Sequence, residues 1–155
     1  MARSFFSSVV VVAAGAWLAG CASGPRCPFG TAAQPARVSQ IRTLLAQTSA
    51  KALIDARPVA VCFDTSTEHG QLLTRDGVRA VLSEAHGDRE LAAELAHLLV
   101  HYEDGLGDGC ARGLQAALDS ETRAEQLENH VREELSLPTV VASELARDDY
   151  RRRCK

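Results

Sequence analysis

Two histidines four residues apart, His97 and His101, are the side chains of this sequence best suited to chemistry. They lie in the largely apolar stretch 91–102, and if this stretch is helical, a spacing of four places both imidazoles on one face. Two imidazoles in this arrangement reach a single ion, and histidine nitrogen is a common ligand of zinc. The sequence therefore offers two ligands for one metal ion, and further ligands must come from elsewhere in the chain.

Glu121 is the candidate third ligand, because it interrupts a mostly apolar helical stripe. A carboxylate on the buried face of a helix needs a partner, since burial of an unpaired charge is costly. A metal ion or a protonated histidine would serve. Steps of three and four residues along the stripe pass through Leu114, Ala117, Glu121, Ala124, Glu128, Val131 and Leu135.

Residues 97–101, His-Leu-Leu-Val-His, resemble the zinc-binding helix of the zincin metallopeptidases, whose signature is His-Glu-x-x-His. Glu121-x-x-x-Glu125 resembles the Glu-x-x-x-Asp/Glu motif that follows this helix in the gluzincin branch. The resemblance covers about residues 38–135 and implies a compact zincin-like core that binds zinc. It further implies that His97, His101 and Glu121 are the ligands and that Glu125 orients a histidine from outside the ligand set.

Leu98 stands where the zincins carry their catalytic glutamate. That glutamate accepts the proton of the zinc-bound water, so its loss removes the general base of peptide hydrolysis. We therefore assign no catalytic residue and expect an inactive, zincin-like pseudoenzyme. An alternative is an active zinc-dependent hydrolase in which Glu94 or Glu103 has become the base.

A third interpretation needs no metal. In it, both histidines belong to a solvated polar stripe on a helix whose other face is apolar. The chain would then be a purely structural protein. This stripe consists of Glu90, Glu94, His97, His101 and Asp104.

Leu18-Ala19-Gly20-Cys21 ends an apolar run, residues 9–19, which follows a single cation, Arg3. This is the layout of a secretory signal peptide, and the tetrad resembles the lipobox of bacterial lipoproteins. The resemblance implies that residues 1–20 are removed and that Cys21 carries lipid, palmitate included. Residues 21–37 would form a flexible tether to the membrane. Ala22 is not the aspartate that resembles an inner-membrane retention signal, so in a cell with two membranes we expect the periplasmic side of the outer one.

Four further cysteines would share the oxidising environment outside the cytoplasm, where an even count favours disulfides. No Cys-x-x-Cys occurs, which disfavours a redox motif or a cysteine zinc knuckle. Four cysteines allow three pairings, and the sequence does not choose among them. Joining the two ends of the domain is the pairing we favour, which gives Cys27–Cys154 and Cys62–Cys110.

Residues 38–155 are expected to form a single α+β domain: a helix, a small antiparallel sheet, and then two to three helices. The first helix runs from Val38 to about Ala56, and residues 59–63 form a strand. Residues 71–82 form a hairpin around Asp76-Gly77, a pair that favours its turn. Helices follow from a cap at Asp88 to about Tyr102, over 114–118, over 120–135 and over 139–153. The last is amphipathic, with an apolar side formed by Val140, Val141, Leu145 and Tyr150.

The chain has 155 residues and a net charge of −3, and no basic stripe with interleaved aromatic residues suggests nucleic-acid binding. The prediction is a lipid-anchored envelope protein whose zincin-like domain acts in binding or assembly. Its partners would be the membrane, through Cys21, and an envelope protein or peptide that the sequence does not identify.

Overall fold

The computed structural model of the chain describes residues 27–28, 31, 33–57, 59–75, 77–105, 110, 112–141 and 144–154. The predicted signal peptide and Cys21 lie outside these residues. Within the described ranges, no helix has both the length and the apolar character needed to cross a membrane.

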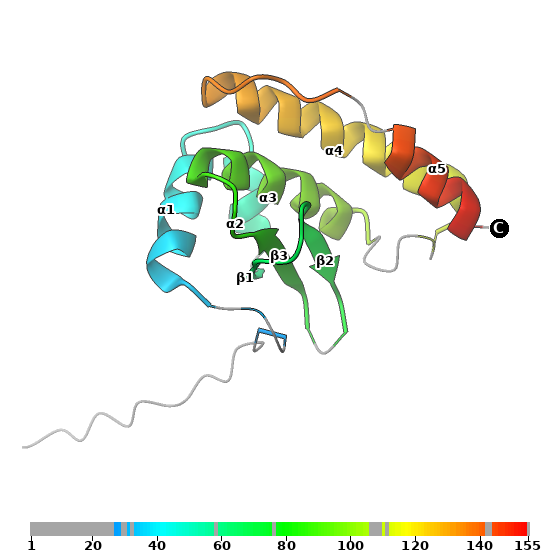
Figure 1. Cartoon of the computed structure of the whole chain (residues 1–155). Helices are drawn as coiled ribbons and strands as arrows, with labels where there is room; N and C mark the ends of the chain where they lie inside the picture. Colours follow the sequence, from blue (N-terminus) through cyan, green and yellow to red (C-terminus); the bar gives the residue numbers. More distant parts are fainter. Residues whose placement is uncertain are drawn as a thin grey trace, which may run out of the picture.

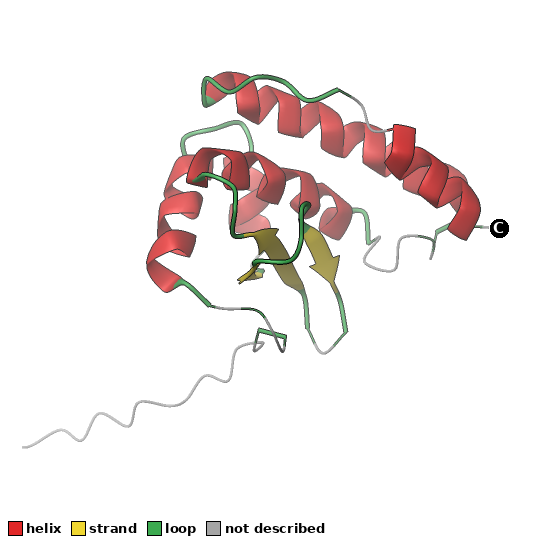
Figure 2. Ribbon diagram, in the orientation of Figure 1, coloured by secondary structure: helices red, strands yellow, loops and turns green. Residues whose placement is uncertain are grey.

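The described residues form an α+β fold, as predicted, with the helices packed on one small sheet (Figures 1 and 2). Helix α3 lies on the sheet, and α4 lies along α3 on the side away from the sheet (Figure 1). In chain order the elements are α1 (Pro35–Leu45), α2 (Lys51–Ala56), β1 (Ala60–Asp64), β2 (Gln71–Leu73), β3 (Arg79–Ser83), α3 (Asp88–Glu103), α4 (Leu114–Glu134) and α5 (Glu144–Arg153).

The sheet is mixed, which corrects the prediction of an antiparallel sheet. Its strand order is β1-β3-β2. The predicted hairpin is confirmed: β2 and β3 are antiparallel, and Gly77 adopts a φ of 106° that favours glycine. The connection after β1 reverses the chain before β2 begins, so β1 pairs with the other edge of β3 in parallel register, from Ala60↔Arg79 to Asp64↔Ser83.

Helix α3 is the centre of the core and contacts α1, α2, α4 and the sheet. Leu91, Leu95 and Leu99 repeat every four residues and are fully buried, which explains why this amphipathic segment folds as a helix. Its first turn is fixed by the Glu90 carboxylate, which accepts a hydrogen bond from the Gly87 N–H at 2.9 Å. Gly87, rather than the expected Asp88, is the N-cap residue.

The single helix expected from Val38 to Ala56 is two helices, α1 and α2. The chain turns after Leu45 because Thr48 and Ser49 bind backbone and side-chain groups that a continuous helix would not use. The Thr48 hydroxyl donates to the Leu45 carbonyl at 2.8 Å, and Glu134 accepts from the Ser49 N–H at 2.9 Å. Helix α1 also starts at Pro35, inside the segment predicted to be a tether.

The C-terminal helices also differ from the prediction. One uninterrupted helix, α4, replaces the two expected between residues 114 and 135. The last helix begins at Glu144 rather than near Thr139. Two of the residues expected on its apolar side are open to solvent, Val141 at 93% and Leu145 at 81% exposure, whereas Val140 and Tyr150 are half-buried.

The four cysteines form two disulfides, as predicted, but the favoured pairing was wrong. The bridges are Cys27–Cys62 and Cys110–Cys154. Cys62 alternates along β1 with the core residues Val61 and Phe63, so its side chain leaves the opposite face of the sheet, where Cys27 meets it.

Candidate metal centre

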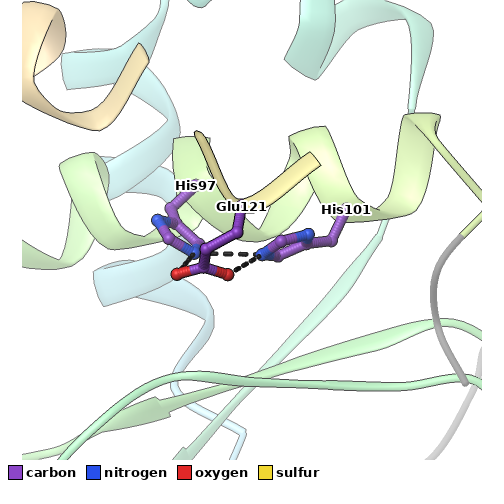
Figure 3. A group of neighbouring side chains, drawn as sticks. All are labelled: His97, His101 and Glu121. Carbon is purple, nitrogen blue, oxygen red and sulfur yellow. Dashed lines mark hydrogen bonds and ion pairs between the residues drawn. The ribbon is translucent and has the colours of Figure 1, made fainter. Parts of the chain in front are cut away.

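The two predicted histidines and the predicted glutamate come together, and they are contributed by two neighbouring helices (Figure 3). Helix α3 carries His97 and His101 one turn apart, and α4, packed beside it, carries Glu121. The two imidazole Nε2 atoms lie 3.1 Å apart. Glu121 Oε2 lies 3.3 Å from His101 Nε2, and Oε1 lies 3.9 Å from His97 Nε2.

Two of these distances, 3.1 and 3.3 Å, are close to those between ligands of a tetrahedral zinc ion, and the third, 3.9 Å, is longer. Ligand atoms about 2.0–2.1 Å from a tetrahedral ion lie about 3.3–3.4 Å from one another. The possible ligand atoms of His97, His101 and Glu121 all lie within 4.8 Å of one another, so a small adjustment of the Glu121 carboxylate toward His97 would bring all three to one ion. Two nitrogens and one carboxylate leave a fourth position to another group.

The remaining nitrogen of each histidine is held by a polar side chain of α4. His97 Nδ1 lies 3.0 Å from Glu128 Oε2, and His101 Nδ1 lies 3.0 Å from Ser120 Oγ. A carboxylate only accepts hydrogen bonds, so Nδ1 of His97 carries the proton and the neutral ring directs its Nε2 lone pair into the cluster. A serine hydroxyl donates or accepts, so Ser120 matches either tautomer of His101.

The carboxylates around the histidines set the protonation of the cluster. Burial alone would lower the pKa of His97, but the hydrogen bond to Glu128 and the charge of Glu121 outweigh it and raise this pKa above its usual value. Burial would raise the pKa of Glu121 and of Glu128. His101 and His97 nevertheless hold the pKa of Glu121 below its usual value, and His97 and Arg132 hold that of Glu128 below its usual value. Glu121 and Glu128 are therefore anionic, and His97 gains or loses a proton according to what it binds.

The metal-free interpretation placed the histidines on a solvated stripe, and this placement was wrong. The side chains of His97 and His101 are 18% and 9% exposed, and that of Glu121 is 6% exposed. Glu121 and Glu128 belong to the buried side of α4, as the stripe through Leu114 predicted.

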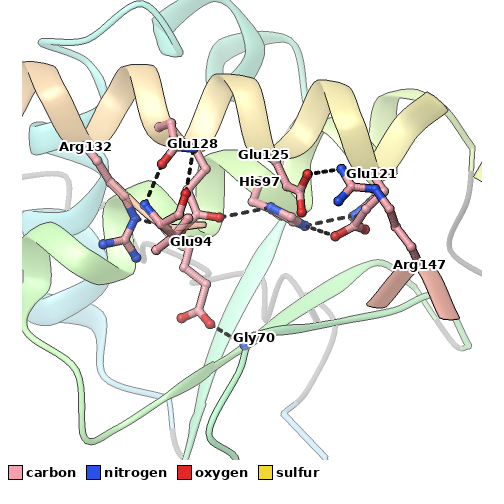
Figure 4. Close-up of polar contacts among 11 residues, drawn as sticks. Gly70, Glu94, His97, Glu121, Glu125, Glu128, Arg132 and Arg147 are labelled. Carbon is pink, nitrogen blue, oxygen red and sulfur yellow. Dashed lines mark hydrogen bonds and ion pairs between the residues drawn. The ribbon is translucent and has the colours of Figure 1, made fainter. Parts of the chain in front are cut away.

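Glu125 lies on the same side of α4 but is bound to α5, where Arg147 donates to its Oε2 (Figure 4). Tyr150, also on α5, is half-buried, and burial together with the charge of Glu121 raises the pKa of its phenol. The resemblance implied that Glu125 orients a histidine. In the structure, Glu128 lies at Nδ1 of His97, and Ser120 lies at Nδ1 of His101.

The residues considered as a substitute base contact other groups. Leu98, at the position of the missing glutamate, is buried in the hydrophobic core at 6% exposure. Glu94 accepts a hydrogen bond from the Gly70 N–H (Figure 4), and its other oxygen is buried without a hydrogen-bond partner, so burial raises its pKa. Glu103 pairs at 3.2 Å with Arg123 and is 41% exposed.

Four residues of the centre were not assigned from the sequence: Ser120, Glu128, Arg147 and Tyr150. Glu128 carried a signal, because it lies on the same mostly apolar stripe as Glu121 and is a second carboxylate there that needs a partner. Ser120 lies one residue before Glu121, and a buried serine there gives no distinctive pattern. The two residues of α5 depend on a long-range contact that no spacing reveals.

Comparison of the chain with protein-family models finds no match, and comparisons with curated proteins and with solved structures find none that is significant. The resemblance to the zincins therefore depends on the motifs quoted above and stays a prediction.

Proposed function

We propose that this protein is a lipid-anchored component of the bacterial cell envelope whose domain binds one zinc ion through His97, His101 and Glu121 and does not hydrolyse peptides. The observation that carries the proposal is the convergence of two imidazole nitrogens, 3.1 Å apart, with a buried carboxylate. Imidazole and carboxylate ligands in this number suit zinc. When bound, the ion would supply a fixed positive charge.

The charges around the ligands support a cation at this position. Glu121, Glu125 and Glu128 face two guanidinium groups, those of Arg132 and Arg147. With both histidines neutral, one negative charge in this buried group has no counterpart. Either a proton on His97 or a bound cation would compensate this charge, so the net charge of the group supports a cation at this position.

The same contacts argue against peptide hydrolysis. A general base must lie within hydrogen-bond reach of the proton that it removes. Leu98 has no proton acceptor, and Glu103 pairs with Arg123. Glu94 binds the Gly70 N–H through one oxygen, and its other oxygen is buried. We infer that the domain acts by binding or assembly in the envelope, where the ion stabilises it or holds a partner.

The test is zinc binding by the full-length protein purified in mild detergent. We expect one zinc ion per chain, measured by metal analysis after removal of weakly bound metal. His97→Ala and Glu121→Gln should abolish binding. His130→Ala is the matched control, because His130 is an exposed histidine on α4 with a side chain 58% exposed.

Two further measurements separate the alternatives. Peptidase activity of the zinc-loaded wild-type protein against a mixture of unstructured peptides would support the active hydrolase. Wild-type protein that binds no more zinc than the His97→Ala variant would refute the metal site and leave the structural interpretation.

A further inference from the structure

Helix α5 lies along the half of α4 that carries Glu121 and Glu125 (Figure 1), yet hydrophobic packing does not hold it there. None of its described residues is buried, and Leu145, its one large aliphatic residue, is 81% exposed. An isolated helix of ten residues is only marginally stable in water. Other contacts must therefore fix its position.

Both ends of this C-terminal region are attached by specific bonds. Before α5, the Asn129 side chain binds the backbone of Val140 twice, accepting from its N–H at 2.7 Å and donating to its carbonyl at 3.0 Å. After α5, Cys154 is joined to Cys110. Helix α5 is thus held between a side-chain clamp and a covalent bridge.

Between these attachments, α5 directs two polar side chains to glutamates of α4. Arg147 binds Glu125 (Figure 4), and both side chains are largely buried, at 15% and 10% exposure. Tyr150 follows Arg147 by three residues, which places it on the same side of α5, where it is half-buried. Burial and the charge of Glu121, the carboxylate ligand, raise the pKa of its phenol. Glu121 and Glu125 lie one turn apart on α4, so without α5 their like charges would repel each other with no cation from this side.

We propose that α5 is a disulfide-held cover of the metal site, in which Tyr150 and Arg147 are positioning residues that fix Glu121 and Glu125. The inference rests on the proposed function, because it concerns the zinc site formed by His97, His101 and Glu121. One oxygen of Glu121 binds the ion while the phenol of Tyr150 restrains the carboxylate. The cover limits access of water and of competing chelators.

Two changes to α5 test this in the full-length, zinc-loaded protein. Tyr150→Phe keeps the ring and removes the hydroxyl, and loss of a group that orients a ligand typically weakens metal binding about 10-fold or more. Tyr102→Phe, a half-buried tyrosine of α3 outside the site, is the control and should leave zinc affinity within about twofold. Arg147→Lys should retain more affinity than Arg147→Ala, because the lysine keeps the positive charge.

Comparison of variants that lack one disulfide or the other tests whether α5 covers the site. The two disulfides span similar sequence separations, 44 residues for Cys110–Cys154 and 35 for Cys27–Cys62. Removing either disulfide should therefore lower the free energy of unfolding by a similar amount. Transfer of zinc to a chromogenic chelator should be at least about tenfold faster in Cys110→Ser/Cys154→Ser than in Cys27→Ser/Cys62→Ser. Circular dichroism checks that both variants are folded.

A measurement without metal separates failure of the cover from failure of the metal site. In metal-free protein, acylation of His97 and His101 by diethyl pyrocarbonate, relative to exposed His130, should accelerate in the Cys110→Ser/Cys154→Ser variant and not in the other. Equal acylation and equal zinc release in the two variants would overturn the cover. If the wild-type protein bound no zinc, the proposed function would fail, and the acylation rates would still decide whether α5 shields the cluster.

Discussion

Raising the pH from about 5.5 to about 8 in the metal-free protein should lower its free energy of unfolding, because folding raises the pKa of His97. The folded protein keeps a proton on His97 that the unfolded chain releases near pH 6.5. This contribution to stability is fully present below that pH and is lost as the pH rises through the raised pKa. Folding also raises the pKa of Glu94, so this residue likewise lowers the free energy of unfolding as the pH rises above 4.5, where the carboxyl group ionises in the unfolded chain.

The other carboxylates act only at lower pH. Folding lowers the pKa of Glu121 and of Glu128 below the usual 4.5. Their contribution is present above pH 4.5 and is lost as the pH falls through their lowered pKa values. The metal-free protein should therefore be most stable in the mildly acidic range, between the lowered pKa values of Glu121 and Glu128 and the raised pKa of His97.

Zinc should reverse this trend. Zinc needs the neutral imidazole, so binding below the raised pKa of His97 displaces one proton from that ring. The apparent affinity then increases about tenfold per pH unit, which equals about 1.4 kcal/mol. Stabilisation by zinc should grow with pH and level off above the raised pKa. At free zinc of about 100 times the dissociation constant, it amounts to about 2.7 kcal/mol.

Thermal unfolding followed by circular dichroism measures both effects, with a chelator in one series and a buffered concentration of free zinc in the other. His130→Ala should reproduce the wild-type behaviour. His97→Ala should remove the zinc response and flatten the metal-free pH dependence. A stabilisation by zinc that is independent of pH, or metal-free protein that becomes more stable between about pH 6 and 8, would refute the protonation scheme.

Three further changes give separate tests. Leu98→Glu buries a charge in the core, so in denaturant titrations its free energy of unfolding should be lower by roughly 3–5 kcal/mol than that of Leu98→Met. A Leu98→Glu variant as stable as the wild-type protein would contradict this. Glu94→Gln should gain stability relative to wild type as the pH rises from about 5 to 8, since it removes a carboxylate whose pKa burial raises; a pH-independent difference would exclude that cause. Cys21→Ala should move the protein from the detergent phase to the aqueous phase in partitioning experiments, and unchanged partitioning would disprove lipidation there.

The parts of the fold that were predictable depend on local patterns. The periodicity that buries Leu91, Leu95 and Leu99 predicted α3 almost to its ends, and Asp-Gly predicted the hairpin. The break after Leu45 also had a local signal in Thr48 and Ser49, two residues that bind backbone groups in turns. That signal was outweighed by apolar residues at helical spacing on both sides.

The parts that were missed depend on contacts between distant segments. Parallel pairing of β1 with β3 and the partner of each cysteine are set by tertiary packing, which local spacing does not encode. Glu121 could be found because a carboxylate inside an apolar stripe needs a partner. Arg147 could not, because it lies on a strongly charged helix where any of several arginines would look alike.

The surroundings of the centre favour retention of an ion over turnover of a peptide. On the side facing the sheet, the chain at Gly70 lies so close to α3 that a Cβ there would be 3.0 Å from atoms of both Glu94 and Leu98, which leaves little space between the chain and α3 at this point. On the side of α4, Arg147 binds Glu125. A substrate would have to displace bonded groups, whereas the proposed ion would need only the three ligands, a neutral His97 and a small movement of Glu121.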